Sequence, residues 1–190
     1  MSGRRLGIRR FAVLAVTTLA LAVVVASPVA AAHAKQDLAW GSGTRAARCS
    51  TCVLPSFQFN ASSDPDGSNA TGSLYVQSAP DWFNATVTCL DVSGKTATLV
   101  GAINVGTGPW DPTATPLYVV VVIQDLGTVT KRHPSPDLMS NIVAASEADW
   151  NTAGYQLDQV CADPIGAIDA VTSGITWQGL VSGDFTVIDR

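Results

Sequence analysis

Three tryptophans in this sequence stand beside an aspartate, in segments whose composition is typical of loops or strand ends. The pairs are Asp81–Trp82, Trp110–Asp111 and Asp149–Trp150. A flat ring next to a hydrogen-bond acceptor is the combination that a sugar-binding platform offers. One hypothesis is that Trp82, Trp110 and Trp150 line one ligand surface. In the simpler alternative, each ring plugs a strand end into the core while its aspartate caps the adjoining turn.

A dense turn sequence, Asp64-Pro-Asp-Gly-Ser-Asn69, contains oxygen ligands that calcium accepts. An EF-hand loop requires Gly at its sixth position and Glu at its twelfth, where this chain has Asn69 and Tyr75. A looser cage of Asp64, Asp66 and Asn69 is the one metal candidate. The composition is more typical of a tight turn, since Asp, Gly and Asn adopt the backbone conformations that turns need. We predict no cofactor.

Residues for nucleophilic or acid–base catalysis are sparse. Outside the N-terminal segment, His133 is the one histidine, and it stands among Lys131, Arg132 and two prolines, as a solvated loop residue does. No serine lies in a G-x-S-x-G motif. No spacing singles out two aspartates as the acid pair of a glycoside hydrolase. We therefore predict no catalytic residue and no enzyme activity.

The N-terminal residues 1–34 have the pattern of a cleaved signal peptide. Four arginines precede an apolar run over 11–26, and Ala32-His-Ala34 is an A-x-A cleavage site. The run falls short of the roughly 20 residues that a spanning helix needs. We therefore expect a secreted, extracellular protein with no membrane insertion after cleavage; the export route, Sec or twin-arginine, stays open.

Removal of this segment makes the chain strongly acidic. The sequence has 11 Lys+Arg and 15 Asp+Glu, and the loss of four arginines leaves 7 basic against 15 acidic residues, a formal net charge of −8. That sign argues against nucleic acid, whose phosphates bind Lys and Arg, and against anionic membranes. We expect a monomer.

Four cysteines in an exported chain favour disulfides over thiols. Three pairings are possible, and we favour Cys49–Cys52 with Cys89–Cys161, because the two cysteines of a C-x-x-C tend to close locally. A zinc site would need a second ligand pair at similar spacing, which the sequence lacks.

The clearest structural signal is a β-hairpin over 83–105 with its turn at Ser93-Gly94-Lys95. Apolar residues alternate along both arms, and the apolar side switches near Cys89–Asp91, which predicts a β-bulge. The sequence LYVVVVIQ at 117–124 is apolar on both faces and predicts a central strand that is covered on both sides.

The remaining segments complete an all-β prediction. We expect a lead-in over 35–52 with at most a short strand, and one domain over 53–190, with strands over 56–61, 72–78 and 183–188. Residues 138–146 fit a strand or a short helix, Ser146 to Asp149 form a fair helix start, and residues 155–162 fit a strand. The fold class is a β-sandwich or β-barrel of about seven or eight mainly antiparallel strands, with one short helix as an option within 138–153.

The order of several motifs carries a resemblance. They are GSGT (41–44), FQFNASSDPDGSNATGSLYVQS (57–78), ATVTCLDVSGKTATLVGAI (85–103), YVVVVIQDLG (118–127), SPDLMS (135–140), Cys161 and SGDFTVID (182–189). In these motifs the chain resembles a group of secreted proteins of actinobacteria and similar bacteria that has no assigned activity. The resemblance implies export and a β-rich domain, and it implies no reaction.

The sequence as a whole favours a non-catalytic extracellular binding module for a glycan or protein ligand. The alternatives are a structural or interaction protein of the cell envelope without a small ligand and, more weakly, a hydrolase. The exposure of Trp82, Trp110 and Trp150 discriminates between them, because rings that share an exposed face favour the binding module.

Overall fold

The computed structural model describes residues 35–45, 54–127 and 137–190. The described strands are β1 (Asp37–Arg45), β2 (Ser56–Ser63), β3 (Thr71–Ser78), β4 (Asp81–Ser93), β5 (Thr96–Gly106), β6 (Leu117–Gln124), β7 (Leu138–Met139), β8 (Val143–Ser146) and β9 (Gln178–Ile188). The helices are α1 (Glu147–Thr152), α2 (Leu157–Ala162) and α3 (Pro164–Val171), with a 3₁₀ turn, η1, at Gly108–Trp110.

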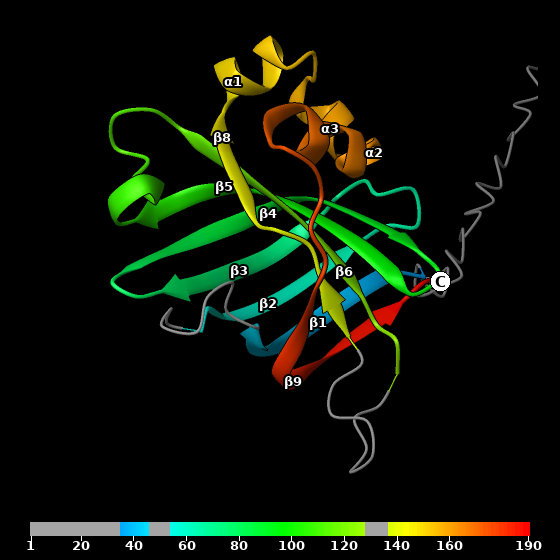
Figure 1. Ribbon diagram of the computed structural model, residues 1–190. Coiled ribbons are helices and arrows are strands. Elements are labelled where there is room, and N and C mark those ends of the chain that lie inside the picture. Colours follow the sequence, from blue (N-terminus) through cyan, green and yellow to red (C-terminus); the bar gives the residue numbers. More distant parts are fainter. Residues whose placement is uncertain (1–34, 46–53, 128–136) are drawn as a thin grey trace, which may run out of the picture. The chain divides into compact units, whose positions relative to one another are not determined.

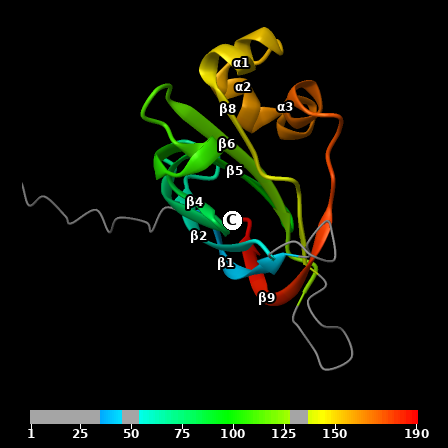
Figure 2. The ribbon, with the colours of Figure 1, turned by 60° about the vertical axis from the view of Figure 1, so that its left-hand side comes forward.

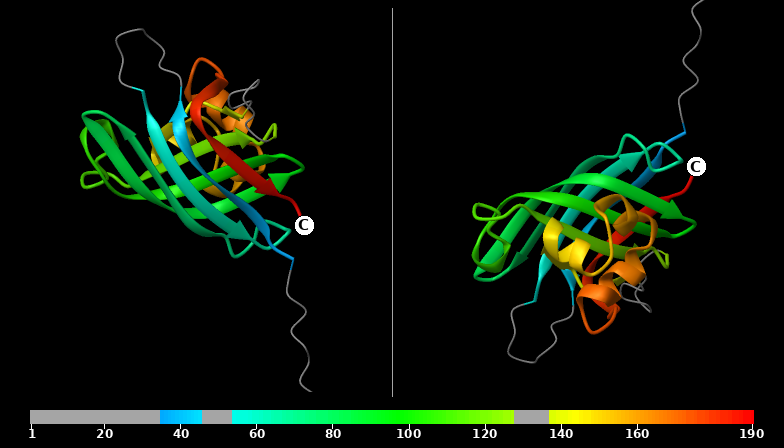
Figure 3. Two further views of the ribbon diagram at one scale, coloured as in Figure 1. Left: turned by 90° about the horizontal axis from the view of Figure 1, so that it is seen from below. Right: turned by 90° about the horizontal axis from the view of Figure 1, so that it is seen from above.

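The strands close into an antiparallel barrel of eight strands. Strands β1 to β6 pair in chain order, β6 pairs with β7, β7 with β9, and β9 returns to β1. The short β8 lies on β6 beyond β7. The all-β prediction is confirmed, and of its two options the barrel is the one that forms (Figure 3).

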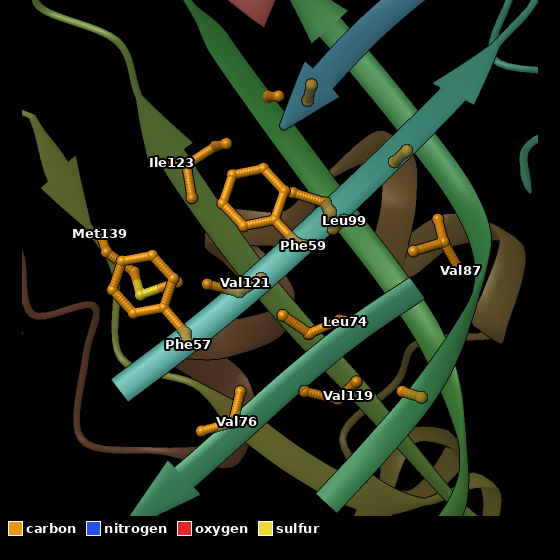
Figure 4. Close-up of a cluster of buried hydrophobic side chains, with 14 of the residues drawn as sticks. Phe57, Phe59, Leu74, Val76, Val87, Leu99, Val119, Val121, Ile123 and Met139 are labelled. Atoms are coloured by element: carbon orange, nitrogen blue, oxygen red, sulfur yellow. The ribbon is translucent and has the colours of Figure 1, made fainter. Parts of the chain in front are cut away.

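The interior of the barrel is filled by side chains. Phe57, Phe59 and Phe185 form a ring cluster, with the Phe185 centroid 5.4 Å from each of the other two. Gly41 pairs with both Phe59 and Phe185, and a Cβ there would overlap the Phe185 ring. Leu, Val and Met side chains from the other strands pack around these rings (Figure 4). A small inner residue on β1 therefore makes room for the large rings opposite.

The prediction that 117–124 is a central strand covered on both faces is confirmed. Val119, Val121 and Ile123 of β6 belong to the barrel interior, and Val120 and Val122 face a second apolar cluster beneath the helices. Helices α1, α2 and α3 lie together against this side of the barrel (Figures 1 and 2). The apolar outer side of β6 thus explains why one side of the barrel is covered.

The hairpin, its bulge and one disulfide also form as expected. Strands β4 and β5 join at Gly94, and their register shifts between Val87 and Cys89. The disulfide Cys89–Cys161 links this bulge to α2, with a Cα–Cα distance of 6.3 Å across 72 residues of sequence. Cys49 and Cys52, like the signal segment 1–34 and the His133 loop, lie outside the described residues.

Two segments differ from their sequence predictions, and a third takes one of the two forms that were left open. The lead-in 35–52 contains β1, a nine-residue strand that pairs with both β2 and β9 and is part of the barrel. The strand expected over 155–162 is instead mostly the helix α2, because the Gln156 N–H at its start donates to Gln159 Oε1 at 3.0 Å and the disulfide holds the helix on β4. Residues 138–146 form β7 and β8, and the helix start at Ser146 begins α1.

The seam between β6 and β9 is closed by aspartate side chains. Strand β7 has two residues, so it leaves part of β9 without a strand partner on that side. The Phe185 N–H donates to Asp137 Oδ2 at 2.7 Å, and the Val187 N–H donates to Asp125 Oδ2 at 3.1 Å. Asp137 Oδ1 also accepts from the Leu126 N–H at 2.9 Å, and Lys95 pairs with Asp125 at 3.1 Å. Two carboxylates therefore replace a missing stretch of strand.

Removal of one carboxylate should open this seam. Asp137→Ala is expected to lower the free energy of unfolding by about 2 kcal/mol or more, because each buried N–H left unpaired costs roughly 1–3 kcal/mol. Denaturant titration measures the loss. Asp91→Ala, at an exposed position on β4, is the matched control and should stay within about 0.5 kcal/mol of wild type. Equal stability of the two variants would contradict a closing role for Asp137.

The Cys89–Cys161 disulfide should contribute much of the free energy that holds the helices against the barrel. Cys89→Ala/Cys161→Ala is expected to lose about 2–5 kcal/mol, since the bond closes a long loop in the unfolded chain. Thermal unfolding compares it with Cys49→Ala/Cys52→Ala, which leaves this bond in place. An unchanged melting temperature in the first variant would show that packing alone holds α2.

Candidate functional site

The side of the barrel formed by β1 to β4 carries an uncharged polar surface, which we call the outer face. Its side chains alternate with the buried ones along each strand, so they point away from the core. They are Leu38, Trp40, Ser42 and Thr44 of β1, Ser56, Gln58, Asn60 and Ser62 of β2, Thr71, Ser73, Tyr75 and Gln77 of β3, and Trp82, Asn84, Thr86 and Thr88 of β4. In the view from below, β1, β2 and β9 lie in front and the helices behind (Figure 3, left).

Trp40 is the most exposed ring of this face, with 42% of its surface accessible. A shallow hollow lies on each side of it along β1, one of about 360 Å³ and one of about 500 Å³. The first is lined by Leu38, Asn60, Ser62, Thr71 and Gly72. The second is lined by Ser42, Gln58, Asn60, Gly183, Asp184 and Thr186. Trp40 and Asn60 line both, so the hollows form one continuous surface.

Cross-strand hydrogen bonds hold the polar side chains of the outer face in place. Asn60 Oδ1 accepts from the Ser73 N–H at 3.1 Å and from the Ser73 hydroxyl at 3.2 Å. The hydroxyls of Ser62 and Thr71 are 3.1 Å apart. Because its oxygen is engaged, Asn60 has its Nδ2 group to donate to a ligand, and no described residue accepts from that group. The polar groups beside Trp40 are therefore ordered before any ligand arrives.

A second aromatic pair lies further round the outer face. The rings of Tyr75 and Trp82 have centroids 6.2 Å apart, and the backbone N–H of Trp82 donates to the Thr107 hydroxyl at 3.1 Å. Both rings are half-buried. Gln58 of β2 pairs with Ser42 of β1 on one side and with Tyr75 of β3 on the other. One row of side chains therefore connects the aromatic pair with the second hollow.

Asp184 is the charged side chain among the described residues that line the two hollows. It lies beside Asp137, which is fully buried with 0% of its surface accessible. Burial raises the pKa of the Asp137 carboxyl, against the lowering effect of the Phe185 and Leu126 N–H groups, and the nearby Asp184 carboxyl raises it further. The structural seam and the second hollow thus meet at this pair.

The structure does not bring the three predicted tryptophans onto one surface. Trp82 is on the outer face, whereas Trp110 packs edge-on against Phe83 at 5.2 Å at the end of the barrel. Trp150 is 1% exposed and lies in the apolar cluster beneath the helices. The prediction is therefore wrong for Trp150, because this ring fills the space between α1 and β6 instead of facing solvent.

The aspartates next to these rings make local contacts. Asp149 forms a capping box with Ser146, whose hydroxyl and N–H lower the pKa of its carboxyl. Asp111 accepts from the Thr113 N–H at 2.9 Å, which likewise lowers its pKa. Asp81 lies over Gly108, where a Cβ would overlap its carboxylate. The turn-capping alternative describes Asp149 and Asp111 well.

The calcium candidate forms a self-contained turn. Asp64 Oδ2 accepts from the Asn69 amide at 2.7 Å and from the Ser68 hydroxyl at 3.4 Å, and Asp66 Oδ1 accepts from the Ser68 N–H at 3.0 Å. Asn69 adopts a positive φ of 53°, as the turn interpretation requires. In the described ranges, no cluster of three or more acidic, His or Cys side chains is arranged for a metal.

Sequence reasoning missed Trp40, the residue around which the hollows form. Residues 38 to 44 do alternate, but their inner members are Ala39, Gly41 and Gly43, so no period of large apolar residues marks a strand. The signal that could have predicted this strand is the alternation of small residues with larger ones along residues 38 to 44. The same weak pattern concealed β1 itself.

Comparisons of the chain with models of protein families, with curated proteins and with solved structures found no match. None of the helices in the described part of the chain is long and apolar enough to cross a membrane. The site is therefore interpreted from its own geometry and chemistry.

The raised pKa of Asp137 has a measurable consequence for stability. The folded state binds the proton of the Asp137 carboxyl more tightly than the unfolded state does. The stabilisation of the fold that this proton contributes is therefore fully present below the ordinary pKa of 3.8 and is lost as pH rises through the raised pKa. Wild type is expected to lose stability relative to Asp137→Asn as pH rises from about 3.5 towards neutral. Melting curves at a series of pH values measure the difference, and a constant difference would contradict the assignment.

Proposed function

We propose that this protein is a secreted binding module that takes a glycan on the outer face of β1 to β4. The observation that carries the proposal is Trp40, an exposed indole between two hollows whose walls include amide and hydroxyl side chains. Export rests on the N-terminal pattern, and the disulfide Cys89–Cys161 is consistent with an oxidising compartment.

The chemistry of the face matches that of a sugar. A pyranose ring has apolar C–H faces and a rim of hydroxyls, each of which both donates and accepts a hydrogen bond. Trp40 offers a flat apolar surface for the ring, and Asn60, Gln58 and Ser42 offer donors and acceptors for the rim. The indole supplies the apolar contact, and these polar groups fix the orientation of such a ligand.

The low charge of the outer face also favours binding. A charged group loses much more hydration free energy than an amide or a hydroxyl when a ligand covers it. The mature chain carries 22 charged residues, yet none of the side chains named above for the outer face is among them, and the exposed Asp91 of β4 lies beyond the bulge at Cys89. This face is therefore less costly to desolvate than an ordinary solvated surface.

The barrel interior supports an external rather than an internal site. Phenylalanine, leucine and valine side chains fill the space between the strands, as Figure 4 shows. A ligand inside would have to displace a packed core, and deletion or displacement of core groups costs several kcal/mol. The hollows beside Trp40 require no such rearrangement.

Loss of the Trp40 ring should abolish most of the binding. Trp40→Ala is expected to weaken binding to a neutral polysaccharide by about tenfold or more, as the loss of a central aromatic contact does. Affinity electrophoresis and calorimetry with laminarin, xylan, hydroxyethyl cellulose and chitin oligosaccharides measure the effect. Leu126→Ala is the control, because Leu126 is an exposed apolar side chain (54%) that lines neither hollow.

Two outcomes would count against the proposal. Wild-type protein that binds none of these glycans while giving a cooperative melting curve would overturn it. So would a Trp40→Ala variant that binds as tightly as the Leu126→Ala control.

A further inference from the structure

We propose that the two hollows beside Trp40 are consecutive subsites for one linear, uncharged polysaccharide chain, and that Asp184 is a specificity-determining residue that rejects anionic sugars. This inference rests on the proposed function and names the class of glycan.

The length of the surface exceeds one sugar ring. From Leu38 in the first hollow to Ser42 in the second, β1 advances four residues, or about 13 Å at the rise of an extended strand. Trp40 lies midway between these positions. A ring stacked on the indole therefore has room for a neighbouring sugar on each side, which is the geometry of an internal stretch of a polymer.

Each hollow is lined in part by a glycine. Gly72 in the first hollow has φ +145°, and a Cβ there would overlap the Asn60 carbonyl. Gly183 in the second hollow has φ +101°, and a Cβ there would overlap the Ser42 carbonyl. Both conformations are strained for other residues. Bare backbone thus forms part of both walls and lets a ligand approach closely on either side of Trp40.

The negative charge of Asp184 at the second hollow favours uncharged ligands over anionic ones. The Asp184 carboxylate accepts hydrogen bonds from neutral sugar hydroxyls, and it repels the carboxylates or phosphates of an acidic polysaccharide. The formal charge of −8 on the mature chain adds to this repulsion at low ionic strength. The lining of the described hollows contains no basic side chain that could compensate.

Charge selectivity is tested with neutral and anionic polysaccharides that share one backbone. The probes are hydroxyethyl cellulose against carboxymethyl cellulose, and laminarin against carboxymethyl curdlan. Wild type should bind the neutral member of a pair at least tenfold more tightly. Asp184→Asn should reduce this ratio at least fivefold, by strengthening the binding of the anionic member. An unchanged ratio in this variant would overturn the role of Asp184.

Subsite number is tested with oligosaccharides of one to six units prepared from the neutral backbone that binds. Affinity should rise at least tenfold from the monosaccharide to the tetrasaccharide. Ser42→Gln and Ser62→Gln each place a longer side chain in one hollow, and each should flatten this rise while Trp40 stays in place. A monosaccharide that binds as tightly as the polymer would contradict the two subsites.

The results separate this inference from the function on which it rests. Binding that depends on Trp40 but shows neither length dependence nor charge selectivity would overturn the inference and leave glycan binding supported. Absence of any glycan binding by folded wild-type protein would overturn both. Melting curves for Asp184→Asn and the two glutamine variants establish that each is folded.

Discussion

The barrel depends on two carboxylates at the place where its ladder of backbone hydrogen bonds is interrupted. Strand β9 passes β6 without a full strand between them, and Asp137 and Asp125 accept the N–H groups of Phe185 and Val187 that would otherwise be buried unpaired. A closed barrel has no free edge only if every strand is satisfied on both sides. Aspartate side chains, each with two acceptor oxygens, thus close the barrel where the backbone pairing is interrupted.

The asymmetry of the barrel follows from strand composition. Strand β6 is apolar on its outer side, and this side is buried by helices that the Cys89–Cys161 disulfide attaches to β4. Strands β1, β2 and β3 have Ser, Thr, Asn, Gln and single aromatic residues on their outer sides, and no described helix packs on them (Figure 1). The position of the helices therefore determines which face of the barrel stays uncovered.

Much of this architecture could be predicted from the sequence, because strong local patterns mark it. The hairpin, its bulge, the doubly covered strand and the Cys89–Cys161 pair all depend on the spacing of large apolar residues or on cysteine chemistry. Strand β1 could not be found in this way, since its inner residues are small and long-range pairing with β2 and β9 stabilises it. Helix α2 is too short to be stable by propensity alone, and tertiary contacts at Cys161 override the local pattern. Trp40 and Asp184 come together through β1 and β9, which are distant in the sequence, so the site was hidden for the same reason.

The pairing of β1 with β9 also places the two ends of the described domain together. Leu38 is opposite Ile188, and the Arg190 N–H donates to Asp37 Oδ1 at 2.9 Å. A short peptide could join these ends, and new termini could be opened at the Gly94 turn between β4 and β5, as circular permutation of compact domains allows. For anyone who attaches this domain to another protein or to a surface, both attachment points emerge beside each other on the barrel.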